Sequence, residues 1–491
     1  MVVVTTLAMP EAQVTGLYAA GVTCFLGLRY ADPPIGARRF APPREISGPR
    51  GTIDATAFAP AAPQAPRSHS QLLHGPVPST DEDCLALNVW VPAERSGLIP
   101  VLVWIHGGAF LSGYTSAPCY EAWRLASLGK IIVITVGYRL GSLGWLSHQD
   151  LSPEQDATVG NWGLLDVMAA LRWIQRNVAD FGGDPDRVTL AGQSAGALCA
   201  LLLLSTRAMS RDFHRVIAQS PLLAVASRDD AARWAAALTE HADCDGVARL
   251  RELPASRIVD ADLELSGKAA FQGLTRGPFP AAGTDTVPWP PSDQRAIQAG
   301  SGIPVLIGHA DDEGLFFYRG SPFSDDTLAR RIRRLAPQLD VASTVRRHRE
   351  NLRQRGMPSG NGAVYSSVWS EERFGAPIRQ WVAQRRRQAE AATYMYRFAH
   401  RSPMLGGASH VVDVPLVFGT HRHPSLRGLC GTGPRVDQLS EQMIASWAAF
   451  AASGCPQMTD LCAWPTDATV VIDSAAPWRA VPEPAASVMG P

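Results

Sequence analysis

A serine between two glycines has the spacing of a nucleophile. Ser194 lies in Gly192-Gln-Ser-Ala-Gly196, directly after an apolar stretch at 187–191 and directly before an apolar helical run from Ala197. In a tight turn from strand to helix the serine hydroxyl is pushed beyond the sheet edge, and the flanking glycines permit the crowded backbone. In a chain with 43 glycines the motif alone is weak, but its strand-turn-helix setting predicts that Ser194 is a nucleophile.

Two further glycines could stabilise an oxyanion. The segment His106-Gly107-Gly108-Ala109-Phe110 directly follows the apolar run Val101–Ile105. Successive glycines let the backbone aim two amides at one point, and the amide of Ala195, after the serine, could complete an oxyanion hole. The competing interpretation is an ordinary glycine turn. His106 itself is expected to support the loop rather than to act as a base.

A hydroxyl nucleophile needs a base, and the base needs a carboxylate that holds its tautomer. Asp311, Asp312 and Glu313 follow the apolar run 303–308, and spacing alone does not choose among them. Of the five later histidines, only His410 stands in a glycine-rich loop. The residues therefore predict His410 as the base and one of these three acids as its partner.

These motifs follow apolar runs that alternate with helical patterns. Val101–Ile105 and Ile131–Val136 are continuously apolar, as in strands covered on both faces, whereas Leu164–Ala179 carries one apolar stripe. The alternation predicts an α/β fold with a mostly parallel sheet.

The later chain is expected to add helices to this sheet. The pattern is mostly helical at about 228–300 and again at about 320–390, with the strand 303–308 between them. We therefore predict a single domain over residues 1–491 with two helical cap insertions.

Composition excludes several classes of protein. The 491 residues hold 45 Lys+Arg and 45 Asp+Glu, and this zero net charge argues against binding nucleic acid or an anionic membrane by bulk charge. Arginine clusters at 330–334, 346–355 and 385–387 are expected to form solvated helix faces. No apolar run approaches the ~20 residues of a membrane span. The first residues lack the basic region of a signal peptide, so a cytoplasmic location is expected.

Metal and disulfide sites have little support. His421 and His423 form a close pair, but no further ligand stands at metal-binding spacing nearby, so no metal is expected. Cys455 and Cys462 are close enough in sequence to bridge, and the sequence leaves this pairing open. It also leaves open whether the protein is a monomer or a homodimer.

Taken together, the motifs resemble the type B carboxylesterase family (cholinesterase-like and para-nitrobenzyl esterase-like) of the α/β-hydrolase superfamily. The resemblance implies an α/β-hydrolase fold, Glu313 as the acid, His410 as the base, and no cofactor. It is carried by segments nearly end to end: Phe25–Pro34, Glu82–Asn88, His106–Phe110, Gly137–Gly141, Gly160–Asp166, Asn177–Pro185, Gly192–Gly196, Asp312–Gly314 and Gly406–Gly419.

Several positions depart from the family pattern. Ala62 stands where a cysteine commonly pairs with Cys84, which fits a reducing compartment. Val411 follows the histidine where glycine is common. Gln219-Ser-Pro-Leu222 replaces Gln-Ser-Gly-Ser, so a serine that can back up the acid is expected to be missing.

The sequence therefore predicts a serine carboxylesterase that hydrolyses uncharged small-molecule esters with short to medium acyl groups through a Ser194 acyl-enzyme. An acyltransferase or cyclase is the alternative, motivated by Val411, Pro221 and Leu222. A non-enzymatic binding protein would predict a broken triad, which the intact residues argue against. An apolar pocket is expected because aromatic residues flank the catalytic segments, namely Phe110, Phe316, Phe317, Tyr318 and Phe418.

Overall fold

The computed structural model describes residues 2–151, 160–206, 209, 211–272, 279–284, 286–318, 322–459 and 462–482. The strands of the central sheet are β1 (Val3–Met9), β2 (Ala12–Ala19), β3 (Val22–Arg29), β4 (Gly51–Asp54), β5 (Ala86–Pro92), β6 (Ile99–Ile105), β7 (Ile132–Val136), β8 (Gly183–Gln193), β9 (Arg215–Gln219), β10 (Val305–Ala310), β11 (Thr393–Phe398), β14 (Ala468–Ile472) and β15 (Arg479–Pro482). They form a 13-stranded sheet in the order β1-β2-β3-β5-β7-β6-β8-β9-β10-β11-β14-β15, with β4 paired to β2.

The middle of the sheet is parallel, as the sequence predicts. Neighbouring strands from β7 through β6, β8, β9, β10 and β11 to β14 all run in the same direction. Side chains along β6 alternate between two cores, with Val101, Val103 and Ile105 on one face. Leu102 and Trp104 lie on the other. A strand buried on both faces has no polar position, which explains its unbroken apolar sequence.

The N-terminal part differs from the predicted alternation of strands and helices. Strands β1, β2, β3 and β5 pair antiparallel in succession. The turn between β2 and β3 is Ala20-Gly21, and both residues have positive φ, 49° and 79°. Turns of two residues can join only antiparallel neighbours, so no crossover helix is formed here.

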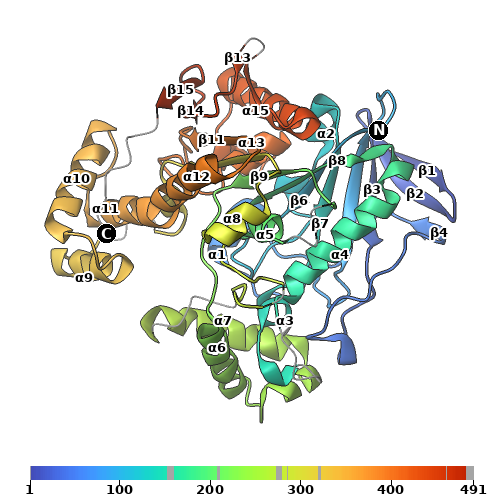
Figure 1. Ribbon diagram of the computed structural model, residues 1–491, viewed down its shortest axis with the longest axis horizontal. Coiled ribbons are helices and arrows are strands. Elements are labelled where there is room, and N and C mark those ends of the chain that lie inside the picture. Colours follow the sequence, from blue (N-terminus) through green and yellow to red (C-terminus); the bar gives the residue numbers. More distant parts are fainter. Residues whose placement is uncertain are drawn as a thin grey trace.

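Helices cover both faces of the sheet and fill its long connections. They are α1 (Ser68–His74), α2 (Trp123–Gly129), α3 (Gly141–Trp145), α4 (Trp162–Asn177), α5 (Ala195–Leu204), α6 (Arg228–His241), α7 (Ala255–Gln272), α8 (Gln294–Ala299), α9 (Asp325–Leu335), α10 (Val341–Gln354), α11 (Asn361–Ser370), α12 (Ala376–Gln388), α13 (Asp413–Phe418), α14 (Arg427–Cys430) and α15 (Pro434–Ser453). Helices α6 to α8 connect β9 to β10, and α9 to α12 connect β10 to β11. Figure 1 shows α6 and α7 at the bottom of the molecule and α9 and α10 at its far left. The division into one domain with two insertions stays a prediction.

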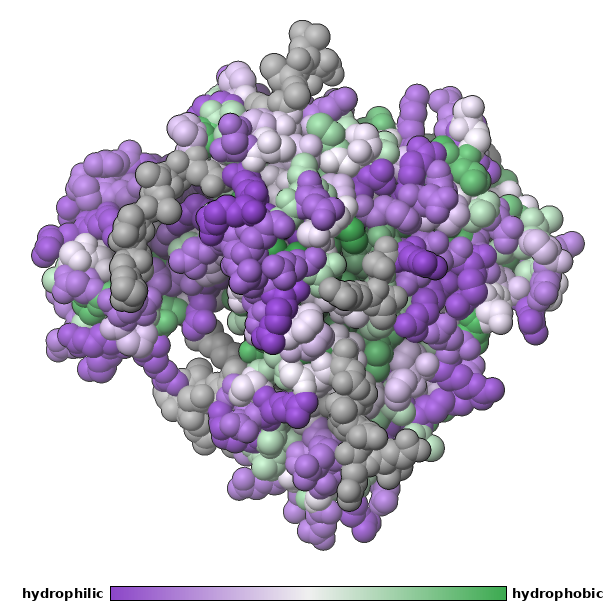
Figure 2. Space-filling model, in the orientation of Figure 1, coloured by the Kyte–Doolittle hydropathy of each residue, from purple (hydrophilic) through white to green (hydrophobic). Residues whose placement is uncertain are grey.

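The arginine clusters are mainly solvated faces, but Arg355 pairs with the buried Asp312 at 2.7 Å and Arg385 turns inward. Arg330, Arg333 and Arg346 are exposed on α9 and α10, which Figure 2 shows as a mainly hydrophilic surface at the left. Arg385 on α12 is instead fully buried, and its Nη2 donates to the carbonyl oxygens of Gly300 and Ile303. The prediction of a solvated face is wrong for this residue, because its guanidinium binds the backbone of the segment directly before β10. No helix in the described ranges is both long and apolar enough to cross a membrane.

A buried ion pair ties α4 to the segment after β7. Arg139 Nε and Nη2 donate to the two carboxylate oxygens of Asp166 at 2.8 and 2.7 Å, and the Arg139 amide adds a bond of 3.1 Å. Both side chains are almost completely buried, at 3% and 0% exposure.

Replacing Asp166 with asparagine should lower the free energy of unfolding by about 3–5 kcal/mol, because Arg139 then stays buried without a counter-charge. The matched control is Glu11→Gln, which breaks an exposed pair with Arg50 and should cost less than about 1 kcal/mol. Urea denaturation at neutral pH measures both values. Equal losses for the two variants would contradict the expectation.

Candidate active site

Ser194 occupies a strained turn between β8 and α5. Its backbone angles are φ 56° and ψ −120°, and its amide donates to the carbonyl oxygen of Gln219 at 2.8 Å. A Cβ on Gly196 would lie 2.0 Å from the carbonyl oxygen of Ile105, and one on Gly192 would lie 2.4 Å from the backbone of Gly196. Only glycine fits at these two positions, so the motif packs the turn tightly against β6.

Glu313 and His410 are in direct contact. Glu313 begins a short 3-10 helix after β10, and its Oε2 pairs with Nδ1 of His410. The two side chains are 0% and 2% exposed. The Nε2 atom of His410 is buried and hydrogen-bonds to no other described residue. His410 and Ser194 line the same cavity, so this ring nitrogen is the one left for a partner there.

A serine does hydrogen-bond to Glu313, the predicted acid. Ser220 Oγ donates to Oε1 of Glu313 at 2.7 Å, and the amide of Ala310 donates to the same oxygen at 2.8 Å. The expectation that Pro221 and Leu222 remove this support is wrong, because the residue that reaches the acid is Ser220 itself. It directly follows β9, and its amide continues the sheet by donating to Gly308 at 2.8 Å.

The glycine loop after β6 lies beside Ser194. Gly108 has φ +123°, and a Cβ there would lie 1.8 Å from the carbonyl oxygen of Ser112. Ala109 and Phe110 also have positive φ, at 55° and 62°. Gly108 and Ala195 line the cavity, and Gly107 lies just behind it, where a Cβ would be 3.3 Å from the Cβ of Ser194. The loop therefore brings the predicted oxyanion residues beside the serine.

His106 supports this loop, as the sequence predicts. Its ring stacks on Tyr138 at 4.5 Å between centroids, and its Nδ1 donates to the carbonyl oxygen of Gly107 at 2.9 Å. Tyr138 in turn donates to the backbone oxygen of His106 at 2.8 Å. Burial lowers the pKa of His106 to about 4, so the ring is neutral at neutral pH.

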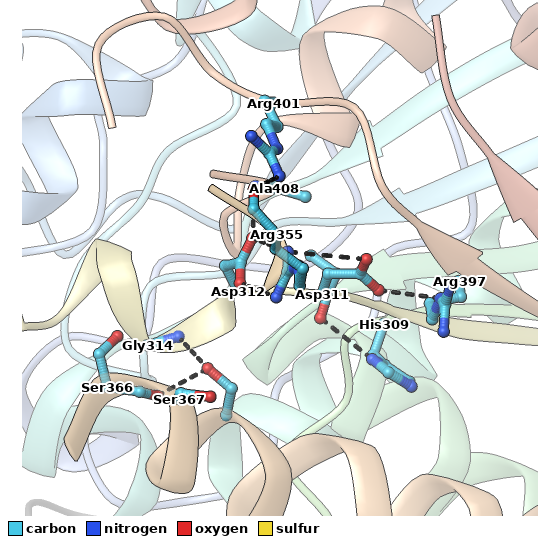
Figure 3. Close-up of polar contacts among 12 residues, drawn as sticks. His309, Asp311, Asp312, Gly314, Arg355, Ser366, Ser367, Arg397, Arg401 and Ala408 are labelled. Atoms are coloured by element: carbon cyan, nitrogen blue, oxygen red, sulfur yellow. Dashed lines mark hydrogen bonds and ion pairs between the residues drawn. The ribbon is translucent and has the colours of Figure 1, made fainter. Parts of the chain in front are cut away.

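Of the two other predicted acids, Asp312 binds the loop that carries His410, whereas Asp311 pairs with an arginine on β11 (Figure 3). Asp312 accepts Nη1 and Nη2 of Arg355 at 2.8 and 2.7 Å and the amide of Ala408 at 3.0 Å. Its own amide donates to the Ala408 carbonyl at 2.7 Å. Asp311 pairs with Nε of Arg397 at 3.0 Å. Asp312 thus joins the acid loop to the histidine loop, and neither aspartate contacts His410.

A further buried carboxylate stands near the acid and base. Asp413 accepts the side-chain amide of Gln219 at 2.7 Å and the hydroxyl of Tyr396 at 3.2 Å. Burial, together with the charge of Glu313, raises the pKa of Asp413 to about 6. The sequence analysis did not single out Asp413, although it lies one helical turn beyond His410.

The cavity above these groups has a volume of about 240 Å³. Three of the five aromatic residues expected there line it, Phe110, Phe316 and Phe317. Tyr318 packs on Tyr365 and Trp369, and Phe418 lies in the core against Trp104. Val411 and Leu222 also line it. No sequence pattern marked the other wall residues, which come from α1, α7, the end of the glycine loop and the segments around Phe279 and α11: Arg67, Ser70, Leu73, His74, Leu111, Ser112, Ser266, Phe279, Trp369 and Phe374.

Metal ligands do not gather in the described part of the chain, where no group of three His, Cys, Asp or Glu could hold an ion. His421 Nε2 bonds to Oδ1 of Asp437 at 2.9 Å, and Nδ1 of His423 bonds to Ser425. Cys455 is a free, exposed thiol. The side chain of Cys462 lies outside the described residues.

A serine in a strand-to-helix turn at a parallel sheet edge, with a paired glutamate and histidine on loops that follow later strands, is typical of an α/β-hydrolase. The carboxylesterase family model matches residues 3–479. The para-nitrobenzyl esterase of Bacillus subtilis (strain 168) is 32% identical over 476 residues, which cover 94% of this chain and 93% of that protein. The chain belongs to the carboxylesterase family.

Solved structures agree with this assignment. A thermophilic PNB esterase superposes with a TM-score of 0.83 at 31% identity, covering 98% of both chains. The carboxylesterase of Geobacillus stearothermophilus gives 0.84 at 30% identity, with the same coverage. The predicted fold, family and enzyme class are confirmed, and the protein is a carboxylic ester hydrolase. The acyltransferase or cyclase alternative is not favoured by these relatives.

The buried, neutral His106 predicts a pH-dependent stability difference. Its folded pKa lies below the ordinary 6.5, so its contribution is complete above pH 6.5 and is lost as pH falls toward 4. The stability gap between the wild type and His106→Asn should therefore narrow by about 2 kcal/mol from pH 8 to pH 5. Urea denaturation across this range measures it.

Tyr138→Phe is the control for this experiment. It removes a neighbouring hydrogen bond without removing a group that titrates in the same range, so its stability loss should stay constant with pH. A constant gap for His106→Asn as well would contradict a neutral buried imidazole.

Proposed function

We propose that Ser194, His410 and Glu313 form a catalytic triad that hydrolyses carboxylic esters through an acyl-enzyme. The observation that carries the proposal is the contact of Glu313 with Nδ1 of His410, which leaves Nε2 for the cavity that Ser194 also lines. A carboxylate on Nδ1 holds the tautomer that can accept a proton at Nε2 and stabilises the imidazolium that forms.

The first half of the reaction releases the alcohol. Ser194 Oγ attacks the ester carbonyl carbon while its proton moves to Nε2 of His410. The amides of Gly107, Gly108 and Ala195 hold the oxyanion of the tetrahedral intermediate. When the intermediate collapses, the bond to the alcohol oxygen breaks, and that oxygen takes the proton from Nε2.

The second half releases the acid. Nε2 accepts a proton from a water that attacks the acyl carbon, and the new tetrahedral intermediate is held by the same amides. Its collapse breaks the bond to Ser194 Oγ, which regains the proton from His410. The reaction needs none of the chain's other acids, and Asp312 acts only by positioning the loops.

The aromatic walls support the sequence prediction of uncharged esters with short to medium acyl groups. Phe316, Phe317 and Phe374 surround the His410 ring at 5.9, 5.1 and 5.0 Å between centroids. Such walls exclude water around the imidazole and bind apolar groups. The expected cytoplasmic location stays a prediction, and every cysteine whose side chain is described is a free thiol, which fits a reducing compartment.

Ser194→Ala should lower kcat on a short-chain p-nitrophenyl ester by at least about 10⁴-fold and abolish stoichiometric labelling by an organophosphate, because no other hydroxyl can form the acyl-enzyme. Ser453→Ala, an exposed serine at the end of α15, is the matched control and should keep both. Turnover that persists in Ser194→Ala would rule out this nucleophile.

Ser220→Ala should lower kcat about tenfold or more with little change in KM. It removes a hydrogen bond to the Glu313 carboxylate, and bonds to charged groups contribute about 1.5–3 kcal/mol. A slower organophosphate labelling rate should accompany the loss, since Ser194 is then less well activated. A fall in thermal stability with unchanged kcat would show that Ser220 serves the fold alone.

A further inference from the structure

One cation lies in the wall of this largely apolar cavity. Arg67 precedes α1 as its N-cap residue and lines the same cavity as Ser194 and His410. Within the described part of the chain it is the only lining residue with a permanently charged side chain. Arg67 has no part in the proposed steps of ester hydrolysis.

Among the residues that the structure describes, the guanidinium of Arg67 has one hydrogen-bond partner. Its Nη2 reaches Ser266 Oγ at 3.4 Å, a long contact, and its Nε is buried without a hydrogen bond. No acid among the described residues lies within ion-pair distance of it. Burial lowers the pKa of Arg67 from its ordinary value, and the charge of Asp262, which makes no ion pair with it, offsets this shift only in part.

The acid whose charge acts most on Arg67 is already engaged. Asp262 on α7 accepts the amide of Ser142 at 2.7 Å and the Ser142 hydroxyl with its other oxygen. Ser266, one turn later on α7, donates to the Asp262 carbonyl and so presents its oxygen to Arg67. Helix α7 therefore orients the guanidinium and leaves most of its N–H donors unused.

We infer that the cavity binds esters that carry a free carboxylate remote from the scissile bond, with Arg67 as the residue that recognises it. A guanidinium fork matches a carboxylate with two parallel hydrogen bonds, and such a pair is strongest where water is excluded. An anionic substituent on the substrate could form the direct ion pair with Arg67 that no described acid forms. The inference rests on the proposed ester hydrolysis by Ser194, and it departs from the prediction of uncharged substrates, which considered only the aromatic segments.

Matched ester pairs test this preference on each side of the scissile bond. On the acyl side, the p-nitrophenyl monoester of hexanedioic acid is compared with the neutral ester in which an isopropyl group replaces the carboxylate. On the alcohol side, the acetate ester of para-(hydroxymethyl)benzoate is compared with that of para-isopropylbenzyl alcohol. The quantity measured is the ratio of kcat/KM for the anionic ester to that for its neutral partner.

Arg67→Met should lower this ratio at least tenfold on one side, mainly through KM of the anionic ester, because a uniform binding interaction is removed. Arg67→Lys keeps the charge but loses the planar guanidinium, so its ratio should lie between those of the wild type and of Arg67→Met. Arg44→Met, which changes an arginine whose side chain is 74% exposed, is the control and should leave the ratio unchanged. The side on which the ratio falls identifies the part of the substrate that faces Arg67.

A measurement on the wild type alone guards against misfolding of the variants. The monoamide of hexanedioic acid should inhibit neutral ester hydrolysis at least ten times more strongly than its isopropyl analogue. Equal inhibition together with a ratio that Arg67→Met leaves unchanged on both sides would overturn the inference. If Ser194→Ala hydrolysed the neutral esters as well as the wild type, the proposed function would fail instead.

Discussion

The active site depends on one backbone hydrogen bond beyond the end of a strand. The amide of Ser194 donates to the carbonyl oxygen of Gln219, which extends the pairing of β8 and β9 into a turn with φ 56°. That conformation is costly for a residue with a side chain, and it persists because the sheet on one side and Gly196 on the other leave no alternative. The parallel register then brings the other loops of the site together, because β6, β9 and β10 end at the same edge of the sheet.

A second layer of contacts fixes Glu313 and His410, the proposed acid and base, once the sheet has placed them. The two carboxylate oxygens of Glu313 have different partners, His410 on one and Ser220 with Ala310 on the other. Both its neighbours in sequence are also held: Asp312 by Arg355 and Gly314 by Ser370. A buried carboxylate whose two oxygens both accept hydrogen bonds is held in its orientation toward the imidazole.

The sequence predicted the parts of the site that follow apolar strands, because a strand end and a glycine turn have a local signature. It could not choose among Asp311, Asp312 and Glu313 without the family resemblance, since the choice depends on which loop each acid faces. The prediction about Ser220 was wrong, because the sequence does not show which position after β9 points its side chain at Glu313. The prediction about Arg385 was also wrong, because basic residues at helical spacing look alike whether they face solvent or a strand end.

The wall residues were missed for a more general reason. The wall residues that were missed come from α1, α7, the segment around Phe279 and α11, which are widely separated in the sequence, and none of these segments carries a motif. The sheet edge sets the chemistry, and its geometry tolerates few substitutions. The walls only have to exclude water and contact the substrate, so they can vary without disturbing the sheet. A charge such as Arg67 on a short helix outside the sheet can therefore change which ester is bound while the groups that cleave it stay the same.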